Sequence, residues 1–346
     1  PRLTAATGGD VLVESTLNAR FPRVRIANLP TPLEEAPRFS QAVGGGRILI
    51  KRDDLTGLAF GGNKTRKLEW LIGAARAEQA DCLITLGAGQ SNHCRQTVAA
   101  AAKVGLDCFL VLYPPFHGEG QGNLLLDDLL GAQIVRADSR APGVVDRVTD
   151  DLTARLRSEG RKPYLVPVGG STPVGALGYV LCAVELQDQL VERGVDVSRV
   201  YFSSGSAGTQ SGLVVGARGL DAGWRLVGVS PGGKGIDVAR HVAQVSNGTA
   251  ELLGLPDRFV PDDILVDDRY TGPAYGTITP ACVEAIRMLA RTEGILLDPV
   301  YAGKAMAGLI DQVRRGEVGR DETVVFIHTG GTPALFAYGP ELLGAG

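Results

Sequence analysis

The 346-residue chain lacks several features that would place it in a special class of protein. No apolar run approaches the roughly 18 residues that a membrane-spanning helix needs, and the N-terminus lacks the basic and then apolar segments of a signal peptide. A net charge of -3 gives no reason to expect a nucleic-acid partner. The sequence therefore predicts a cytoplasmic protein with no membrane and no nucleic-acid partner.

Cysteine and histidine are too few and too scattered to suggest a metal site or a disulfide framework. The five cysteines are odd in number and are never spaced as a metal-binding pair, and the four histidines are isolated. We expect most cysteines to be small buried residues, and Cys94 to pack rather than react, because no second cysteine or base lies near it. No metal site is predicted.

The residues that are abundant favour a compact α/β protein. Hydrophobic residues make up 44% of the chain, and there are 47 glycines. Short apolar runs of β-forming residues alternate with segments of helical periodicity. The runs lie at 48–52, 82–86, 108–113, 133–136, 164–168, 200–202, 226–229 and 323–328. Continuous apolar strands alternating with helices are typical of parallel sheets with helices on both faces. Residues 244–261 show poor periodicity and are predicted to be a connection.

Glycine-rich loops follow four of these strands, where open α/β sheets bind their ligands. Lys64 lies in a separate glycine-containing segment, Gly61-Gly62-Asn63-Lys64, just before a helical pattern. A helix N-terminus carries partial positive charge and disfavours a cation. A lysine that is neutral or covalently bound avoids this conflict, so Lys64 is a candidate anchor for an aldehyde or ketone cofactor. The alternative is a solvated lysine at an ordinary helix start.

The loop at residues 204–209 has the form of a phosphate cradle. It follows a strand and precedes a helical run, and its small residues let backbone N–H groups converge on an anion beside Ser206 and Thr209. It lacks the signatures of ATP and dinucleotide sites, so a monophosphate is the predicted ligand. An ordinary tight strand-to-helix turn is the alternative.

Two further groups complete the candidate site. The turn Gln90-Ser91-Asn92-His93 opens a helix, so its N–H groups and the Ser91 hydroxyl could hold a substrate carboxylate. Ser91 as a simple helix cap and His93 as a structural residue are the alternatives. Tyr275 and Tyr301 are flanked by Gly or Pro, which suggests rigid loops presenting an acid or base; otherwise they are core-edge aromatics.

A lysine at a helix start, a monophosphate cradle and a carboxylate-binding turn fit one cofactor, pyridoxal 5′-phosphate (PLP). In this order the motifs resemble the D-cysteine desulfhydrase and 1-aminocyclopropane-1-carboxylate (ACC) deaminase family of fold-type II, tryptophan-synthase-β-like PLP enzymes. The likeness covers nearly the whole chain. It is carried by Pro30-Thr-Pro-Leu33, Lys51-Arg-Asp-Asp54, Gly61-Gly-Asn-Lys64, Gln90-Ser-Asn-His93, Gly205-Ser-Ala-Gly-Thr209, Asp298-Pro-Val-Tyr301 and His328-Thr-Gly-Gly331.

The resemblance implies a role for each candidate residue. Lys64 would bond the cofactor and later move the Cα proton, and Asn92 would bond the ring hydroxyl oxygen. Ser91, with the backbone of Asn92 and His93, would hold the substrate carboxylate. Tyr275 and Tyr301 would flank the substrate, Thr329 would lie near the pyridine nitrogen, and the phosphate would be bound by Gly205, Ser206, Ala207, Gly208 and Thr209.

The resemblance also implies the organisation of the chain. A large PLP-binding domain would be built from residues 1–60 and 170–346, and a smaller mobile domain from residues 61–169. Each domain would contain a mostly parallel twisted sheet flanked by helices. The protein would be a homodimer acting on a small amino-acid substrate.

Two departures from the ACC deaminase pattern favour β-elimination at the Cβ–S bond of cysteine or a cysteine-like amino acid. Ala302 stands where those enzymes have a glutamate, and His93 replaces a glutamine. A carboxylate at 302 would keep the pyridine nitrogen protonated, whereas a hydroxyl such as Thr329 leaves a weaker electron sink, which suits a good leaving group.

Four alternatives stay open. A start at Pro1 and the loop 114–121 favour a cysteine lyase domain excised from a polyketide synthase, acting on an S-cysteinyl adduct of a carrier-bound chain. ACC deaminase and L-cysteate sulfo-lyase share the same framework. A noncatalytic PLP-binding or amino-acid-binding protein is the fourth, because fold does not fix function.

Overall fold

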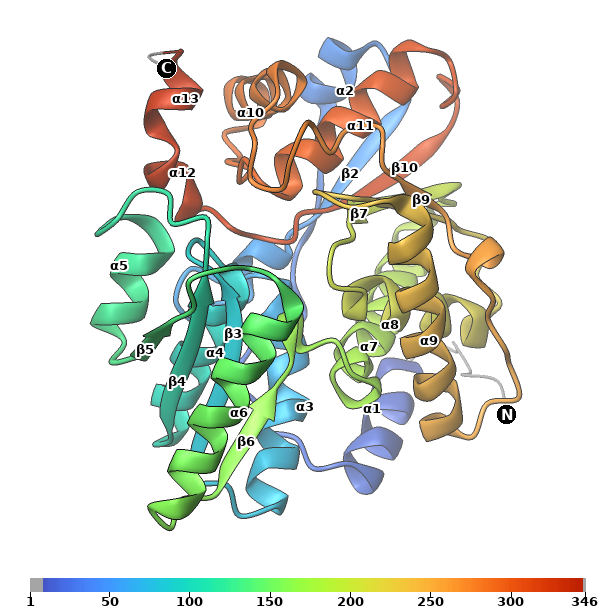
Figure 1. The fold of residues 1–346 in the computed structure, drawn as a ribbon. Coiled ribbons are helices and arrows are strands. Elements are labelled where there is room, and N and C mark those ends of the chain that lie inside the picture. Colours follow the sequence, from blue (N-terminus) through green and yellow to red (C-terminus); the bar gives the residue numbers. More distant parts are fainter. Residues whose placement is uncertain (1–8, 345–346) are drawn as a thin grey trace.

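The computed structural model describes residues 9–344, and side chains from residue 13 onward. Two sheets organise this part of the chain (Figure 1). The larger has six strands in the order β1-β2-β10-β7-β8-β9, and the smaller has four in the order β5-β4-β3-β6. Every neighbouring pair is parallel except β1–β2. The larger sheet consists of β1 (Leu33–Glu35), β2 (Arg47–Lys51), β7 (Arg199–Ser203), β8 (Arg225–Val229), β9 (Val266–Asp267) and β10 (Thr323–Ile327).

The smaller sheet is formed by the middle of the chain and lies beside the C-terminal helices in Figure 1. Its strands are β3 (Cys82–Ala88), β4 (Asp107–Tyr113), β5 (Gln133–Arg136) and β6 (Pro163–Val166). The α-helices in the described residues are α1 (Gly9–Arg20), α2 (Pro37–Val43), α3 (Asn63–Ala77), α4 (Asn92–Val104), α5 (Gly122–Leu129), α6 (Pro142–Ser158), α7 (Pro173–Arg193), α8 (Gly208–Leu220), α9 (Gly235–Leu253), α10 (Pro280–Glu293), α11 (Ala302–Arg314), α12 (Ala334–Ala337) and α13 (Gly339–Leu343).

Apolar side chains on both faces of the larger sheet explain why helices cover it on two sides. In β2, Ile48 and Ile50 pack with α2, α10 and α11, while Leu49 between them packs with α7 and α8. Successive side chains of a strand point to opposite faces, so a continuous apolar run requires a cover on each face. The α/β fold class predicted from the sequence is confirmed.

All eight predicted strands are present, with ends shifted by a few residues at most. Strands β1 and β9 were not predicted, because three and two residues are too short to show a period. The prediction of a connection over residues 244–261 was wrong for residues 244–253, since α9 continues to Leu253. Its buried face there includes Ser246 and Thr249 among small apolar residues, and this polar content hides the helical period.

Helix α3 packs against both α4 and α7 and so joins the two sheet layers. The four strands of the smaller sheet all fall between residues 61 and 169. The domain boundaries themselves stay a prediction, and residues 1–8 of the predicted large domain lie outside the described residues. Among residues 9–344, α7 alone is long and apolar enough to cross a membrane, by length and composition only. Its apolar window is 72% buried, and core helices meet the same criterion.

Candidate active site

The loop before Lys64 is held in a conformation that few residues adopt. Ala59, Phe60, Gly61 and Gly62 have φ values of 46°, 68°, 62° and 128°. A Cβ on Gly62 would lie 2.6 Å from Nε2 of Gln96, so glycine is required there. The guanidinium of Arg95 donates to the carbonyls of Ala59 (2.6 Å) and Gly61 (3.0 Å). This loop places Lys64 as the second residue of α3.

Asn63 connects Lys64 to two other loops of the site. Its Oδ1 accepts a hydrogen bond of 2.8 Å from Nζ of Lys64, and its Nδ2 donates one of 2.8 Å to the Thr209 hydroxyl. Its backbone N–H donates to the carbonyl of Thr329 at 3.0 Å. Sequence reasoning did not select Asn63, although it lies directly before the selected lysine.

The surroundings of Lys64 make its neutral form more accessible than it is for a lysine in water. Burial lowers its pKa to about 8, against the attraction of Asp298 and with a further contribution from Arg95. Part of the side chain still faces the pocket, and Nζ lies 5.8 Å from the ring centroid of Tyr301. An amine with this pKa is partly unprotonated near neutral pH and can act as a nucleophile or base.

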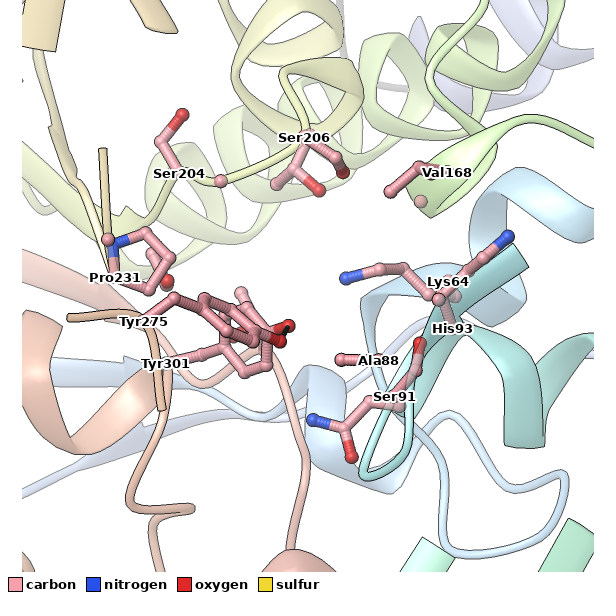
Figure 2. Close-up of a pocket in the computed structure, with 18 of the residues that line it drawn as sticks. Lys64, Ala88, Ser91, His93, Val168, Ser204, Ser206, Pro231, Tyr275 and Tyr301 are labelled. Carbon is pink, nitrogen blue, oxygen red and sulfur yellow. Dashed lines mark hydrogen bonds between the residues drawn. The ribbon is translucent and has the colours of Figure 1, made fainter. Parts of the chain in front are cut away.

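A cavity of about 250 Å³ brings most of the predicted site together. Figure 2 shows Lys64 pointing across it toward Tyr275 and Tyr301, with Ser91 and Ser206 on different sides. Of the predicted site residues, the cavity is lined by Lys64, Ser91, Asn92, His93, Gly205, Ser206, Ala207, Thr209, Tyr275, Tyr301 and Thr329. Further lining residues that the sequence did not single out include Tyr113, Arg140, Val168, Pro231 and Gly232.

Gly208 is the one predicted site residue that does not line this cavity. It begins α8, and its N–H donates to Oγ of Ser171 at 3.1 Å. Within the described residues, the N–H groups of Ser206, Ala207 and Thr209 donate no hydrogen bond, and all three residues line the cavity. Unpaired N–H groups at the start of a helix are suited to an anion.

The turn before α4 forms a second group of free donors. Ser91 caps α4, since its Oγ accepts from the N–H of Cys94 at 3.2 Å, and the residue also lines the cavity. In residues 9–344 the N–H groups of Asn92 and His93 have no partner. Ser91 is therefore both the predicted helix cap and a residue of the cavity.

Two buried residues fix the side chains of this turn. Asn123 donates from Nδ2 to Oδ1 of Asn92 at 2.8 Å and to the carbonyl of Gln90 at 2.9 Å. Nε2 of His93 lies 2.8 Å from the Thr85 hydroxyl. Burial, together with the charges of Lys64 and Lys67, holds the pKa of His93 well below its usual value, so its imidazole is neutral. Burial also raises the pKa of the Cys94 thiol, so Cys94 is unsuited to act as a nucleophile.

The hydroxyls of Tyr275 and Tyr301 hydrogen-bond to each other on the wall opposite Lys64. Burial raises the pKa of both phenols, so both keep their protons at neutral pH. Asp298 fixes the turn that carries Tyr301 by accepting from the N–H groups of Val300 (3.0 Å), Tyr301 (2.9 Å) and Ala302 (2.7 Å). Ala302 is buried among apolar residues and is not part of the cavity wall.

Comparisons with known proteins show what this chain is similar to as a whole. The family profile described as “Pyridoxal-phosphate dependent enzyme” matches residues 24–330. A crystal structure described as an ACC deaminase homologue is 40% identical, with a TM-score of 0.87, over 95% of this chain and 98% of that chain. A PLP-dependent aspartate racemase is 17% identical, with a TM-score of 0.66, over 96% and 97% of the two chains, and shows likeness of fold alone.

The residues of the cavity fit PLP. The N–H groups of Ser206, Ala207 and Thr209 suit its phosphate, and Lys64 suits its aldehyde. Lys67, one turn after Lys64, has a buried Nζ with no hydrogen-bond partner in the described structure, and its Cδ lies 3.4 Å from where a Cβ would stand on Gly208. Burial holds the pKa of Lys67 well below its usual value. A phosphate bound in the neighbouring loop would give this buried amine a negatively charged partner.

Proposed function

This chain belongs to the family of pyridoxal-phosphate-dependent enzymes, and we propose that it cleaves the Cβ–S bond of cysteine or a cysteine-like amino acid by β-elimination. One observation carries the proposal: none of the residues that line the described cavity is Asp or Glu. A carboxylate beside the pyridine nitrogen would keep that nitrogen protonated and strengthen the electron sink, as opening a cyclopropane ring requires. A hydroxyl such as Thr329 suits the departure of a good leaving group.

The reaction divides into bond changes that balance without an oxidant. The Cα–H and Cβ–S bonds break, a Cα=Cβ bond forms, and sulfur leaves as a thiolate that takes up a proton. The released 2-aminoacrylate reacts with water to give pyruvate and ammonia. PLP, when bound, makes Cα acidic by accepting the charge that remains after the proton leaves. The products are a thiol or sulfide, pyruvate and ammonia.

Lys64 is the base in this proposal. Its pKa of about 8 leaves part of the amine free near neutral pH, and its Nζ points across the cavity toward the wall where the amino acid would lie. The hydrogen bond to Asn63 directs this amine and leaves its lone pair available when the amine is neutral. Lys64 can therefore take the proton from Cα.

Ser91 and the free N–H groups of Asn92 and His93 would hold the substrate carboxylate. These donors lie at the N-terminus of α4, where the partial positive charge of the helix adds to their effect. Binding of the carboxylate there would orient Cα relative to Lys64.

Tyr275 and Tyr301 would protonate the departing sulfur. Both phenols keep their protons at neutral pH, and the hydrogen bond between them lets one replace a proton that the other donates. A thiolate is a stronger base than the sulfur of the intact substrate, so the proton is needed only as the Cβ–S bond breaks.

A larger S-substituted or carrier-bound cysteine adduct is a second candidate substrate, and the loop at residues 114–121 supports it. Gly89 donates its N–H to the carbonyl of Pro115 at 3.3 Å, and Nε2 of Gln90 donates to the carbonyl of His117 at 2.7 Å. This loop therefore packs directly against the turn that would hold the substrate carboxylate.

One incubation series separates the candidate activities. The protein, reconstituted with PLP, is given D-cysteine, L-cysteine, S-ethylcysteine, L-cysteate and ACC in turn, and keto acid, sulfide, thiol and sulfite are measured. Release of sulfide or thiol with pyruvate supports the proposal. Keto acid from ACC alone would identify an ACC deaminase, and sulfite from cysteate a sulfo-lyase.

A noncatalytic protein would turn over none of these compounds. The matched control is Lys64→Ala, which should lose both turnover and the absorbance of the lysine-bound cofactor. Turnover that survives Lys64→Ala would contradict the assigned role of Lys64.

The proposal extends to assembly and location: a homodimer, as the family resemblance implies, located in the cytoplasm, as the sequence predicts. The five free cysteines are all buried, which is compatible with a reducing compartment. Light scattering of the purified protein and fractionation of the source cells test these two points separately.

A further inference from the structure

A second hollow adjoins the cavity and shares Tyr275 and Arg140 with it. Its walls come from segments far apart in sequence, namely the loop after β4, the segment after Gly272, the start of α10 and the C-terminal helices. Apolar residues such as Pro115, Ile278 and Val283 form much of the surface. Because Tyr275 and Arg140 belong to both walls, the outer hollow lies directly beside the cavity.

Arg140 is an unpaired cation at the junction of the two hollows. The residue is exposed, and its guanidinium carbon lies 5.7 Å from the ring centroid of Tyr275. Within residues 9–344 it forms no hydrogen bond and no ion pair, although Glu341 and His117 also line the outer hollow. Among residues lining the inner cavity, Lys64 is the other cationic side chain.

We propose that the outer hollow is a subsite for the S-substituent of a cysteine conjugate, and that Arg140 selects substituents ending in an anionic group such as a carboxylate. The inference rests on the proposed Cβ–S cleavage and specifies its substrate class. A guanidinium presents paired donors that match a carboxylate, and stacking on Tyr275 restricts its orientation. The apolar walls suit the methylene groups between the sulfur and that carboxylate.

Two substrates of nearly equal size test the role of charge. S-Carboxymethylcysteine ends in a carboxylate, and S-carbamoylmethylcysteine ends in a neutral amide. Thiol release is measured for both, as D and L isomers, and the preference is the ratio of their kcat/KM values. The two leaving thiols differ in acidity, but this difference cancels when the ratio in a variant is divided by the ratio in the wild type.

Arg140→Gln should lower the preference for the carboxymethyl compound by roughly two- to fivefold, the size expected of one exposed ion pair. The preference in the wild type should also shrink with added salt. Arg140→Lys should keep part of the preference for the carboxymethyl compound, because the charge remains while the paired donors are lost.

Arg136→Gln is the matched control, since it removes the same charge nearby. Arg136 lies on β5, pairs with Glu119 at 2.6 Å, and lines neither hollow. Its variant should keep the wild-type preference. The proposal is overturned if Arg140→Gln leaves the ratio unchanged, or if Arg136→Gln lowers it equally.

A binding measurement distinguishes failure of the proposed reaction from failure of the proposed subsite. If neither compound releases thiol, each is titrated into the PLP-loaded protein while the cofactor absorbance is followed. A binding preference for the carboxymethyl compound that is lost in Arg140→Gln would support the subsite and contradict the lyase assignment. Absence of any binding preference would overturn the subsite as well.

Discussion

The side-chain amide of Asn63 donates a hydrogen bond of 2.8 Å to the hydroxyl of Thr209, across 146 positions of sequence. The same side chain accepts from Nζ of Lys64 at 2.8 Å. Asn63 thereby sets the position of the lysine amine relative to the loop that would bind the cofactor phosphate. PLP must reach both groups at once, so this bridge is expected to contribute to cofactor binding.

A double-mutant cycle measures the bridge. Asn63→Ala and Thr209→Val should each weaken PLP binding. The double variant should lose about 1 kcal/mol less binding free energy than the two single variants lose together, because both single changes remove the same hydrogen bond. Binding is measured by titrating PLP into the apoprotein. Ser211→Ala is the control partner, since its Oγ donates to the Val242 carbonyl and does not contact Asn63. Equal coupling in both cycles would contradict the bridge.

Replacing Asn123 with leucine should disturb the substrate turn while keeping side-chain size. The change removes the donors to Asn92 and to the Gln90 carbonyl. Leaving buried acceptors without partners should lower the free energy of unfolding by about 1–3 kcal/mol. Turnover should fall as well, because Asn92 loses its fixed orientation. Chemical denaturation and initial rates check these effects, with Leu129→Ala, 70% exposed on the same helix, as the control. Similar behaviour of the two variants would refute the role of Asn123.

Lys64→Met should stabilise the apoprotein at neutral pH. The folded-state pKa of about 8 lies below the ordinary value of 10.5. Below pH 8 the amine is protonated in both states, and folding bears the full cost of burying the charge. This cost disappears as the pH rises from 8 to 10.5. The gain in the variant should therefore approach about 3 kcal/mol at or below pH 7 and shrink toward pH 10.

Denaturant unfolding across this pH range measures the gain. Lys103→Met, an exposed residue of α4, should change stability little. A gain in Lys64→Met that stayed constant with pH would show that it comes from packing rather than from charge.

Tyr301→Phe and Tyr275→Phe test the proposed proton donor. Each change removes one hydroxyl of the pair and keeps the ring, so the fold should be retained. Loss of a positioned acid should lower kcat by roughly 10²- to 10⁴-fold for at least one of them. Steady-state pyruvate formation is the measurement. Tyr113→Phe, which removes a phenol from the same cavity wall but not from the pair, should cost much less. Full activity in both variants of the pair would exclude them as acids.

The α/β fold class and most predicted site residues could be found from sequence because their signals are local. Apolar runs such as 323–328 show strands within a few residues, and small residues after a strand, as at 205–209, show an anion loop. Lys64, Ser91 and Tyr301 each stand in such a local pattern, and the cavity contains all three. The second half of α9 was missed because Ser246 and Thr249 lie on its buried face.

The remaining parts of the site depend on contacts between distant segments. Asn63 acquires its role from Thr209, and Asn123 from Asn92. Arg140 is an ordinary surface arginine in sequence, and only folding places it over Tyr275 between two hollows.

Eight of the strands, the anion loops and the candidate lysine follow from the sequence alone, because backbone preference and side-chain period act over a few residues. The tertiary structure decided which donors stay unpaired, which amine is buried, and which charge faces the cavity. Hydrogen-bond partners and desolvation depend on neighbours in space, and these are set only when the two sheets and their helices pack together.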